Sequence, residues 1–145
     1  MDADIRRIET DEQVAVAWEV VRQLRPHLDR GDLVAAVQRQ RAEGYRAVGA
    51  YAEGVCVAFA GYRIQQMLAH GRLLYVDDLV SDAAERGSGY GRALMHWMRA
   101  EAEAEGCDAL QLDSGSHRLE AHAFYFRFGL RIQAFHFGMR LSPPP

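Results

Sequence analysis

Residues 86–94 read RGSGYGRAL, and this stretch follows a predicted strand and precedes a predicted helix. Glycines let backbone N–H groups approach an anion closely, and the N-terminus of the following helix adds a partial positive charge. Arg86 and Arg92 place two cations beside the turn. The combination suits a phosphate or pyrophosphate, but the turn taken alone favours a plain strand-to-helix connection, and only together with a second motif does it favour anion binding.

Two common phosphate-binding motifs do not fit this stretch. A dinucleotide fingerprint started at Gly87 fails because its last glycine position is Arg92, and the preceding strands read as hairpins instead of a βαβ unit. A Walker A loop needs a lysine, whereas all 17 basic residues of this chain are arginine. The pattern that remains is R-x-x-G-x-G, formed by Arg86, Gly89 and Gly91.

Hydrophobic periodicity outward from the turn predicts one domain of the α+β (α/β) class. The predicted strands are residues 3–9, 46–52, 55–64, 73–80, 109–113 and 132–141. The predicted helices are a first one from Thr10-Asp11 to near Pro26, a short one after Asp32, one over residues 91–105, and one capped by Ser116 that ends at Gly129. We expect a mostly antiparallel sheet of about 6–7 strands with four flanking helices, in which a right-handed crossover makes the fourth and fifth strands parallel. Residues 1–142 would form the domain, and residues 143–145 a disordered tail.

Composition excludes several classes of function. The 145 residues carry a formal net charge of −3 without a basic block, which argues against nucleic-acid binding. No apolar stretch is long enough to span a bilayer and no leader opens the chain, so we expect a cytoplasmic protein. Cys56 and Cys107 predict neither a disulfide framework nor a metal site, and the six histidines form no ligand cluster. The arginine, alanine and glycine bias hints at a bacterial source.

The chain resembles the GNAT superfamily of N-acetyltransferases at two places. The first is the strand Tyr75 to Val80 together with the R-x-x-G-x-G turn, and the second is AHAFY at residues 121–125 followed by Phe128-Gly129-Leu130. Both motifs lie in the expected strand and helix contexts and at the expected separation. One position departs from the resemblance, because Arg118 stands where many relatives carry asparagine, seven residues before the helix tyrosine.

The resemblance implies acetyl-CoA as co-substrate, with no metal. It implies that the fourth and fifth strands splay apart and that pantetheine pairs with the exposed strand edge, here Leu79, Val80 and Ser81. It implies that backbone amides of the turn hold the pyrophosphate, here those of Arg86, Gly87, Ser88, Gly89, Tyr90, Gly91 and Arg92.

The resemblance also implies catalytic roles, because an attacking amine must lose a proton and the departing thiolate must be protonated or stabilised. Tyr125 matches the helix tyrosine of the family and is the predicted acid, although it could instead be a core aromatic residue. Asp77 is the predicted base, acting through water, with Asp78 and Asp113 in reserve. Strand alternation would place Asp77 on the face of Tyr75 and Leu79, and Asp78 on the other face. The alternative is that these carboxylates only attract a cationic amine or pair with arginine.

These features predict an N-acetyltransferase that acetylates a primary amine of a small molecule or peptide by direct attack in a ternary complex. The acidic strand residues favour a small cationic amine, and the resemblance implies that the segment from about Leu24 to Tyr45 would shape its site. A catalytically silent acyl-CoA-binding sensor or interaction module is the alternative. The exposed last strand could also pair two copies of the chain across a two-fold axis, which would give a homodimer.

Overall fold

The computed structural model describes residues 3–144, which fall into two compact units, one up to Gln111 and one from Leu112. The first unit is built on a sheet with the strand order β1-β2-β3-β4-β5. The strands are β1 (Asp4–Ile8), β2 (Arg46–Ala52), β3 (Val55–Met67), β4 (Gly71–Ser81) and β5 (Ala109–Leu112). The first four run antiparallel to their neighbours, and β5 is parallel to β4. The helices are α1 (Asp11–Val21), α2 (Arg30–Arg41), α3 (Tyr90–Ala104) and α4 (Leu119–Phe128), and a short 3₁₀ helix, η1, covers Ala83–Glu85.

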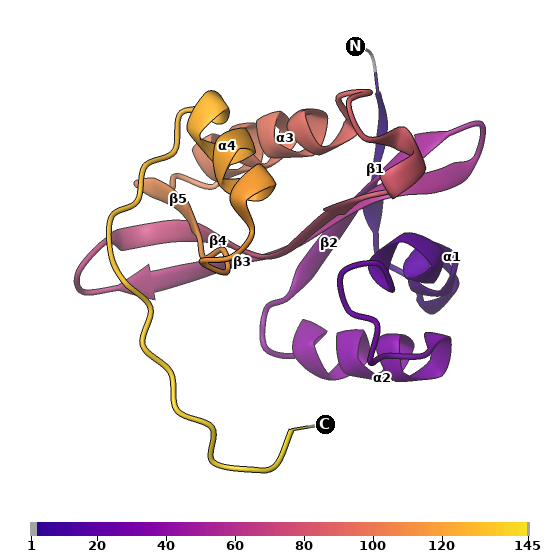
Figure 1. Ribbon diagram of the computed structural model, residues 1–145, viewed down its shortest axis with the longest axis horizontal. Coiled ribbons are helices and arrows are strands. Elements are labelled where there is room, and N and C mark those ends of the chain that lie inside the picture. The colour runs from indigo at the N-terminus through magenta and orange to yellow at the C-terminus, as the bar shows by residue number, and fades with distance from the viewer. Residues whose placement is uncertain (1–2, 145) are drawn as a thin grey trace. The chain divides into compact units, whose positions relative to one another are not determined.

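Helices cover both faces of the sheet in the first unit (Figure 1). Both α1 and α2 lie on one face, where Phe59 of β3 joins a buried cluster with Val14, Leu33 and Val37. On the other face, α3 buries Leu94, Met95 and Met98, which recur at helical spacing. The crossover from β4 through α3 to β5 makes these two strands parallel, as predicted.

The helix starts of α1 and α2 follow from local chemistry. Thr10 and Asp29 each cap a helix through a reciprocal capping box, in which the N-cap side chain accepts from the N3 backbone N–H and the N3 side chain accepts in return. Because Asp29 is the cap, α2 begins before the predicted Asp32. The helix α1 ends at Val21, earlier than Pro26, because the next N–H groups turn back to Val20 and Val21 in a tighter turn.

The prediction of 6–7 strands was too high, since residues 3–144 contain a five-stranded sheet. The missing strand is the segment of residues 132–141, which has no strand conformation although its apolar side chains alternate. Its large side chains Phe135, Phe137, Met139 and Leu141 are exposed. Alternation decides which side chains share a face, but a strand also needs a neighbouring edge that satisfies its N–H and C=O groups.

The second unit contains α4, which begins after Arg118 instead of being capped by Ser116, and ends at Gly129 with a positive φ of 110°. Of the predicted tail, residues 143 and 144 follow without helix or strand, and Pro145 lies outside the described residues. No helix within residues 3–144 combines the length and the apolar character that crossing a bilayer requires.

Candidate functional site

The glycine turn places open backbone at the start of α3. Gly87 and Gly89 have positive φ values of 86° and 89°, a conformation that glycine adopts without the steric cost other residues incur. Gly89 is the N-cap of α3 and makes no side-chain cap hydrogen bond. Because the first N–H groups of a helix lack intrahelical acceptors, those of Tyr90 and Gly91 are suited to an anion from outside the chain. Arg86 and Ser88 are exposed beside them.

The edge of β4 that precedes the turn is longer than its neighbour β5. Asp108 donates its N–H to the Arg72 carbonyl at 2.6 Å, so β5 starts beside the beginning of β4. With four residues against the eleven of β4, β5 extends along only the first half of that strand. Leu79, Val80 and Ser81 lie in the second half, which is the arrangement that a splayed pair of strands requires.

A β-bulge in β4 changes where the two neighbouring carboxylates point. In the register of the two strands, Gly61 of β3 is opposite Asp78 and Tyr62 is opposite Val76. Asp77 is therefore an extra residue of β4 with no residue of β3 opposite it. The predicted alternation is therefore wrong at this point. Asp77 and Asp78 both meet residues on the face covered by α1 and α2, instead of pointing to opposite faces.

Asp78 accepts hydrogen bonds on both carboxylate oxygens. Arg25, from the loop after α1, donates Nη2 to Oδ1 at 2.8 Å, and the Tyr45 hydroxyl donates to Oδ2 at 2.8 Å. Burial, and then the charge of Asp78, raise the pKa of Tyr45 well above its ordinary value, so this phenol stays protonated at neutral pH. The Asp78 carboxylate is thus ion-paired and still 19% exposed, which leaves room for a further contact.

Asp77 forms a separate ion pair with Arg63 of β3, at 2.6 Å between Nε and Oδ2. Arg63 also donates Nη2 to Gln40 of α2 at 2.7 Å, which ties the pair to the helix. Burial raises the pKa of Asp77 above its ordinary value, against the opposing effect of Arg63. A raised pKa makes this carboxylate a stronger base than a solvated aspartate.

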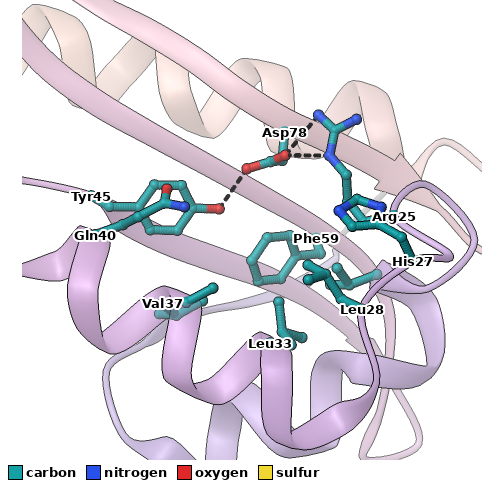
Figure 2. A pocket seen from close by; sticks show the side chains of 11 residues that line it. Arg25, His27, Leu28, Leu33, Val37, Gln40, Tyr45, Phe59 and Asp78 are labelled. Carbon is teal, nitrogen blue, oxygen red and sulfur yellow. Dashed lines mark hydrogen bonds and ion pairs between the residues drawn. The ribbon is translucent and has the colours of Figure 1, made fainter. Parts of the chain in front are cut away.

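A cavity of about 320 Å³ opens beside Asp78, between the sheet and the two N-terminal helices. Figure 2 shows Arg25 and His27 at one end, Tyr45 and Gln40 at the other, and Phe59, Val37 and Leu33 forming the apolar side. Val21, Leu28 and Ala36 complete the lining. The predicted acceptor segment from Leu24 to Tyr45 supplies most of these residues, whereas Asp77 is not among them.

Tyr45 reaches Asp78 because Gly61 lies beneath its ring. A Cβ atom at Gly61 would collide with the Tyr45 hydroxyl and ring. The sequence pattern does not reveal this pair, because an isolated glycine within a strand indicates a bulge or a close approach without identifying the approaching residue.

Tyr125 lies on α4, in the second unit. Its ring meets Phe124 edge to face, with 5.4 Å between the ring centroids. Burial raises the pKa of the Tyr125 phenol, against the nearby Arg118 cation, so the hydroxyl remains protonated at neutral pH. A protonated phenol can donate a proton or a hydrogen bond, as the predicted role requires.

Two further polar residues of the second unit have local partners. Asp113, a reserve base, pairs with His136 at 2.9 Å, and Nε2 of His122 donates to the Gly115 carbonyl at 2.8 Å. Within residues 3–144, no three histidine, cysteine or acidic side chains are arranged to hold a metal ion.

Comparisons with known proteins agree with this architecture. The sequence model of the acetyltransferase (GNAT) family matches residues 6–130. The uncharacterized N-acetyltransferase YhdJ of Bacillus subtilis is 28% identical over 138 residues, which cover 92% of this chain and 95% of that protein.

Solved structures give the same result. An acetyltransferase from Trypanosoma brucei is 26% identical, with a TM-score of 0.76 over 98% of this chain and 100% of that one. The structure of AAC(6′)-Iy in complex with the bisubstrate analog CoA-S-monomethyl-acetylneamine shares the fold at 17% identity, with a TM-score of 0.81 over 99% of this chain and 100% of that one. Because the family match spans most of the sequence, the chain belongs to the acetyltransferase (GNAT) family.

Proposed function

We propose that the protein transfers an acetyl group from acetyl-CoA to a primary amine of a small molecule or peptide, by direct attack in a complex that holds both substrates. The observation that carries the proposal is the Gly89 turn, which presents uncapped N–H groups at the start of α3. A diphosphate fits such a turn, because backbone donors and the helix dipole act on the same anion. AAC(6′)-Iy, which has this fold and binds a CoA-containing analog, supports the choice of co-substrate.

The cofactor contacts proposed for this chain follow from that fit. Backbone amides between Arg86 and Arg92 would hold the pyrophosphate, and the open edge of Leu79, Val80 and Ser81 would pair with the pantetheine arm. Acetyl-CoA, when bound, supplies an activated acyl thioester. A metal ion has no proposed role.

Proton transfer is assigned to Asp77 and Tyr125, and contact with the amine to Asp78. The N–C bond forms as the C–S bond breaks, the amine proton passes to a base, and the departing sulfur receives a proton. Asp77 stays the proposed base, acting through water, and its raised pKa favours that role. Asp78 borders the cavity, so we expect its carboxylate to contact the amine. Tyr125 is the proposed acid, because its phenol stays protonated.

The first experiment measures CoA binding by calorimetry and thiol release from acetyl-CoA with a panel of amines. Gly89→Val should weaken CoA binding about tenfold or more, because a branched side chain at this positive φ displaces the amides. Gly54→Val is the matched control, since Gly54 has a φ of 80° in the β2–β3 turn and should leave CoA affinity unchanged. Equal losses in both variants would contradict the proposal. Binding without thiol release for any amine would instead identify a silent sensor.

Tyr125→Phe tests the acid. It should lower kcat about 10²-fold while CoA affinity stays nearly constant. Tyr51→Phe on β2 serves as the control for loss of a tyrosine hydroxyl. An unaltered kcat would show that Tyr125 has a packing role and is not the acid.

Two further expectations accompany this function. Residues 132–141 alternate in polarity, and pairing of this segment with a second copy of the chain would give the homodimer that we propose. Sedimentation of the purified protein at twice the chain mass would support it. A bacterial, cytoplasmic setting likewise remains an expectation from the sequence.

A further inference from the structure

The cavity beside Asp78 has two chemically different sides. Its apolar side includes Leu28, Leu33, Val37 and Phe59, and its polar edge places Arg25 and Asp78 next to each other (Figure 2). The loop that carries Arg25 is held in place, because the Trp18 indole donates Nε1 to the Leu28 carbonyl at 3.0 Å. This hydrogen bond fixes the loop that borders the cavity, so the cavity is a defined feature of the first unit.

The charges around the cavity cancel. Asp78 is paired with Arg25, and the neighbouring Asp77 is paired with Arg63. Two carboxylates and two guanidinium groups leave no net negative field to attract a polycation. The strand carboxylates, which in the sequence favoured a small cationic amine, thus provide no uncompensated charge.

Arg25 is positioned to bind an anion as well as Asp78. Within residues 3–144, its hydrogen bonds run through Nε and Nη2, to Asp78 and to the Asp77 carbonyl. This leaves Nη1 of the guanidinium as a donor. His27 lies at the same end of the cavity and adds an imidazole that can donate to an anion (Figure 2).

The volume limits the size of the occupant. About 320 Å³ is near the lower end of the range of roughly 300–1,000 Å³ found for small-molecule sites. A single amino acid fits such a volume, whereas an aminoglycoside or several peptide residues would extend beyond it. The apolar side is suited to a branched aliphatic or aromatic side chain.

We propose that the acceptor is a free α-amino acid with an apolar side chain, bound with its carboxylate on Arg25, its amino group beside Asp78 and its side chain against Leu33, Val37 and Phe59. This inference rests on the proposed function. A zwitterion complements an existing ion pair, because its ammonium group meets the carboxylate and its carboxylate meets the guanidinium.

The test compares amines that differ in one group each. Thiol release from acetyl-CoA is measured with L-leucine, L-leucinamide, glycine, a leucyl dipeptide and spermidine. L-leucine should have the highest kcat/KM, about tenfold or more above leucinamide and above glycine, because each of these lacks one of the two anchors. Binding of L-leucine to the protein–CoA complex, followed by calorimetry, gives a readout that does not depend on turnover.

Variants make the test specific to Arg25. Arg25→Gln should raise KM for L-leucine about tenfold while leaving KM for leucinamide nearly unchanged, and His27→Ala should act in the same direction with a smaller effect. Arg22→Gln is the matched control, since Arg22 is exposed after α1 and pairs with Glu19 instead of lining the cavity. His27 is exposed, so its variant reports on the anchor even if Arg25→Gln fails to fold.

The outcomes separate the two proposals. Faster turnover of spermidine, of leucinamide or of the dipeptide than of L-leucine would overturn the amino-acid acceptor while the acetyltransferase function stands. CoA binding without thiol release from any amine would overturn the proposed function and the acceptor with it.

Discussion

Each face of the sheet carries an arginine, a carboxylate and a tyrosine joined by hydrogen bonds. The pocket cluster, on the side of α1 and α2, is Arg25, Asp78 and Tyr45. The α3 cluster, on the other side, is Arg7, Glu101 and Tyr62, with 2.7 Å from Arg7 Nη1 and 2.6 Å from the Tyr62 hydroxyl to the same oxygen, Oε2, of Glu101.

The two clusters differ in their surroundings. Arg7 lies over the Trp97 ring at 4.9 Å from its centroid, and the Glu101 side chain is only 9% exposed. Neither Glu101 nor Tyr62 lines the cavity that borders Asp78. The same residue types in the same bonding pattern can thus join a helix to a sheet on one face and line a candidate acceptor site on the other. What distinguishes them is the space beside the carboxylate.

Replacing each carboxylate by its amide should separate these roles most strongly. Asp78→Asn is expected to lower kcat/KM for the amine about 10²-fold, because the group that meets the amine loses its charge. Glu101→Gln should leave kcat/KM nearly unchanged. Steady-state thiol release measures both, and a comparable loss of activity in the two variants would contradict the distinction.

The pocket cluster depends on the close contact between Gly61 and Tyr45. Gly61→Val should destabilise the protein by about 1–3 kcal/mol, because its side chain would displace Tyr45 from Asp78. Gly31→Ala on α2 is the control, since a Cβ there would make only an ordinary contact at 3.5 Å with Asp29. Urea unfolding measures both free energies. A Gly61→Val variant as stable as the parent would show that Tyr45 has room to move.

The two tyrosines provide a smaller, paired test. Tyr45→Phe and Tyr62→Phe each remove one hydroxyl donor to a carboxylate and should each cost about 1 kcal/mol of unfolding free energy. Only Tyr45→Phe should also change KM for the acceptor, because only Tyr45 lines the cavity. A changed acceptor KM in Tyr62→Phe would be incompatible with this comparison.

The pH dependence of stability should give the smallest effect, with opposite signs at two carboxylates. The hydrogen bond from Arg7 lowers the pKa of Glu101 in the folded protein. The contribution of Glu101 to the free energy of unfolding is therefore present above the unfolded-state pKa near 4.5, and it is lost as pH falls through the folded-state pKa. Burial raises the pKa of Asp77 in the folded protein. The contribution of Asp77 to the free energy of unfolding is therefore present below the unfolded-state pKa near 3.8, and it is lost as pH rises through the folded-state pKa.

Denaturation of Glu101→Gln, Asp77→Asn and the parent between pH 3 and 7 measures these contributions. The advantage of the parent over Glu101→Gln should shrink on acidification. The parent should gain stability relative to Asp77→Asn over the same range. Parallel curves for the three proteins would refute both assignments.

Local patterns in the sequence were sufficient for most elements of the fold. The change from helical to strand periodicity near Tyr45, the glycines that end elements and the N-cap at Thr10 placed the four α-helices and the five strands correctly, apart from the earlier end of α1 at Val21. The segment from Leu24 to Tyr45 supplies most of the cavity lining, and its role in binding an acceptor stays a prediction. The strand expected over residues 132–141 was wrong, since its alternation says nothing about a partner edge.

The sequence by itself determined the glycine turn before α3, because positive φ values and an uncapped helix start are properties of the residues in that turn. Only the tertiary structure decided where Asp77 and Asp78 point and which arginine each one meets. A β-bulge arises from the register between two strands, and Arg25, Gly61 and Tyr45 reach Asp78 from positions that are far from it in the chain. Contacts of this kind leave no local pattern, because each residue alone is compatible with many neighbours.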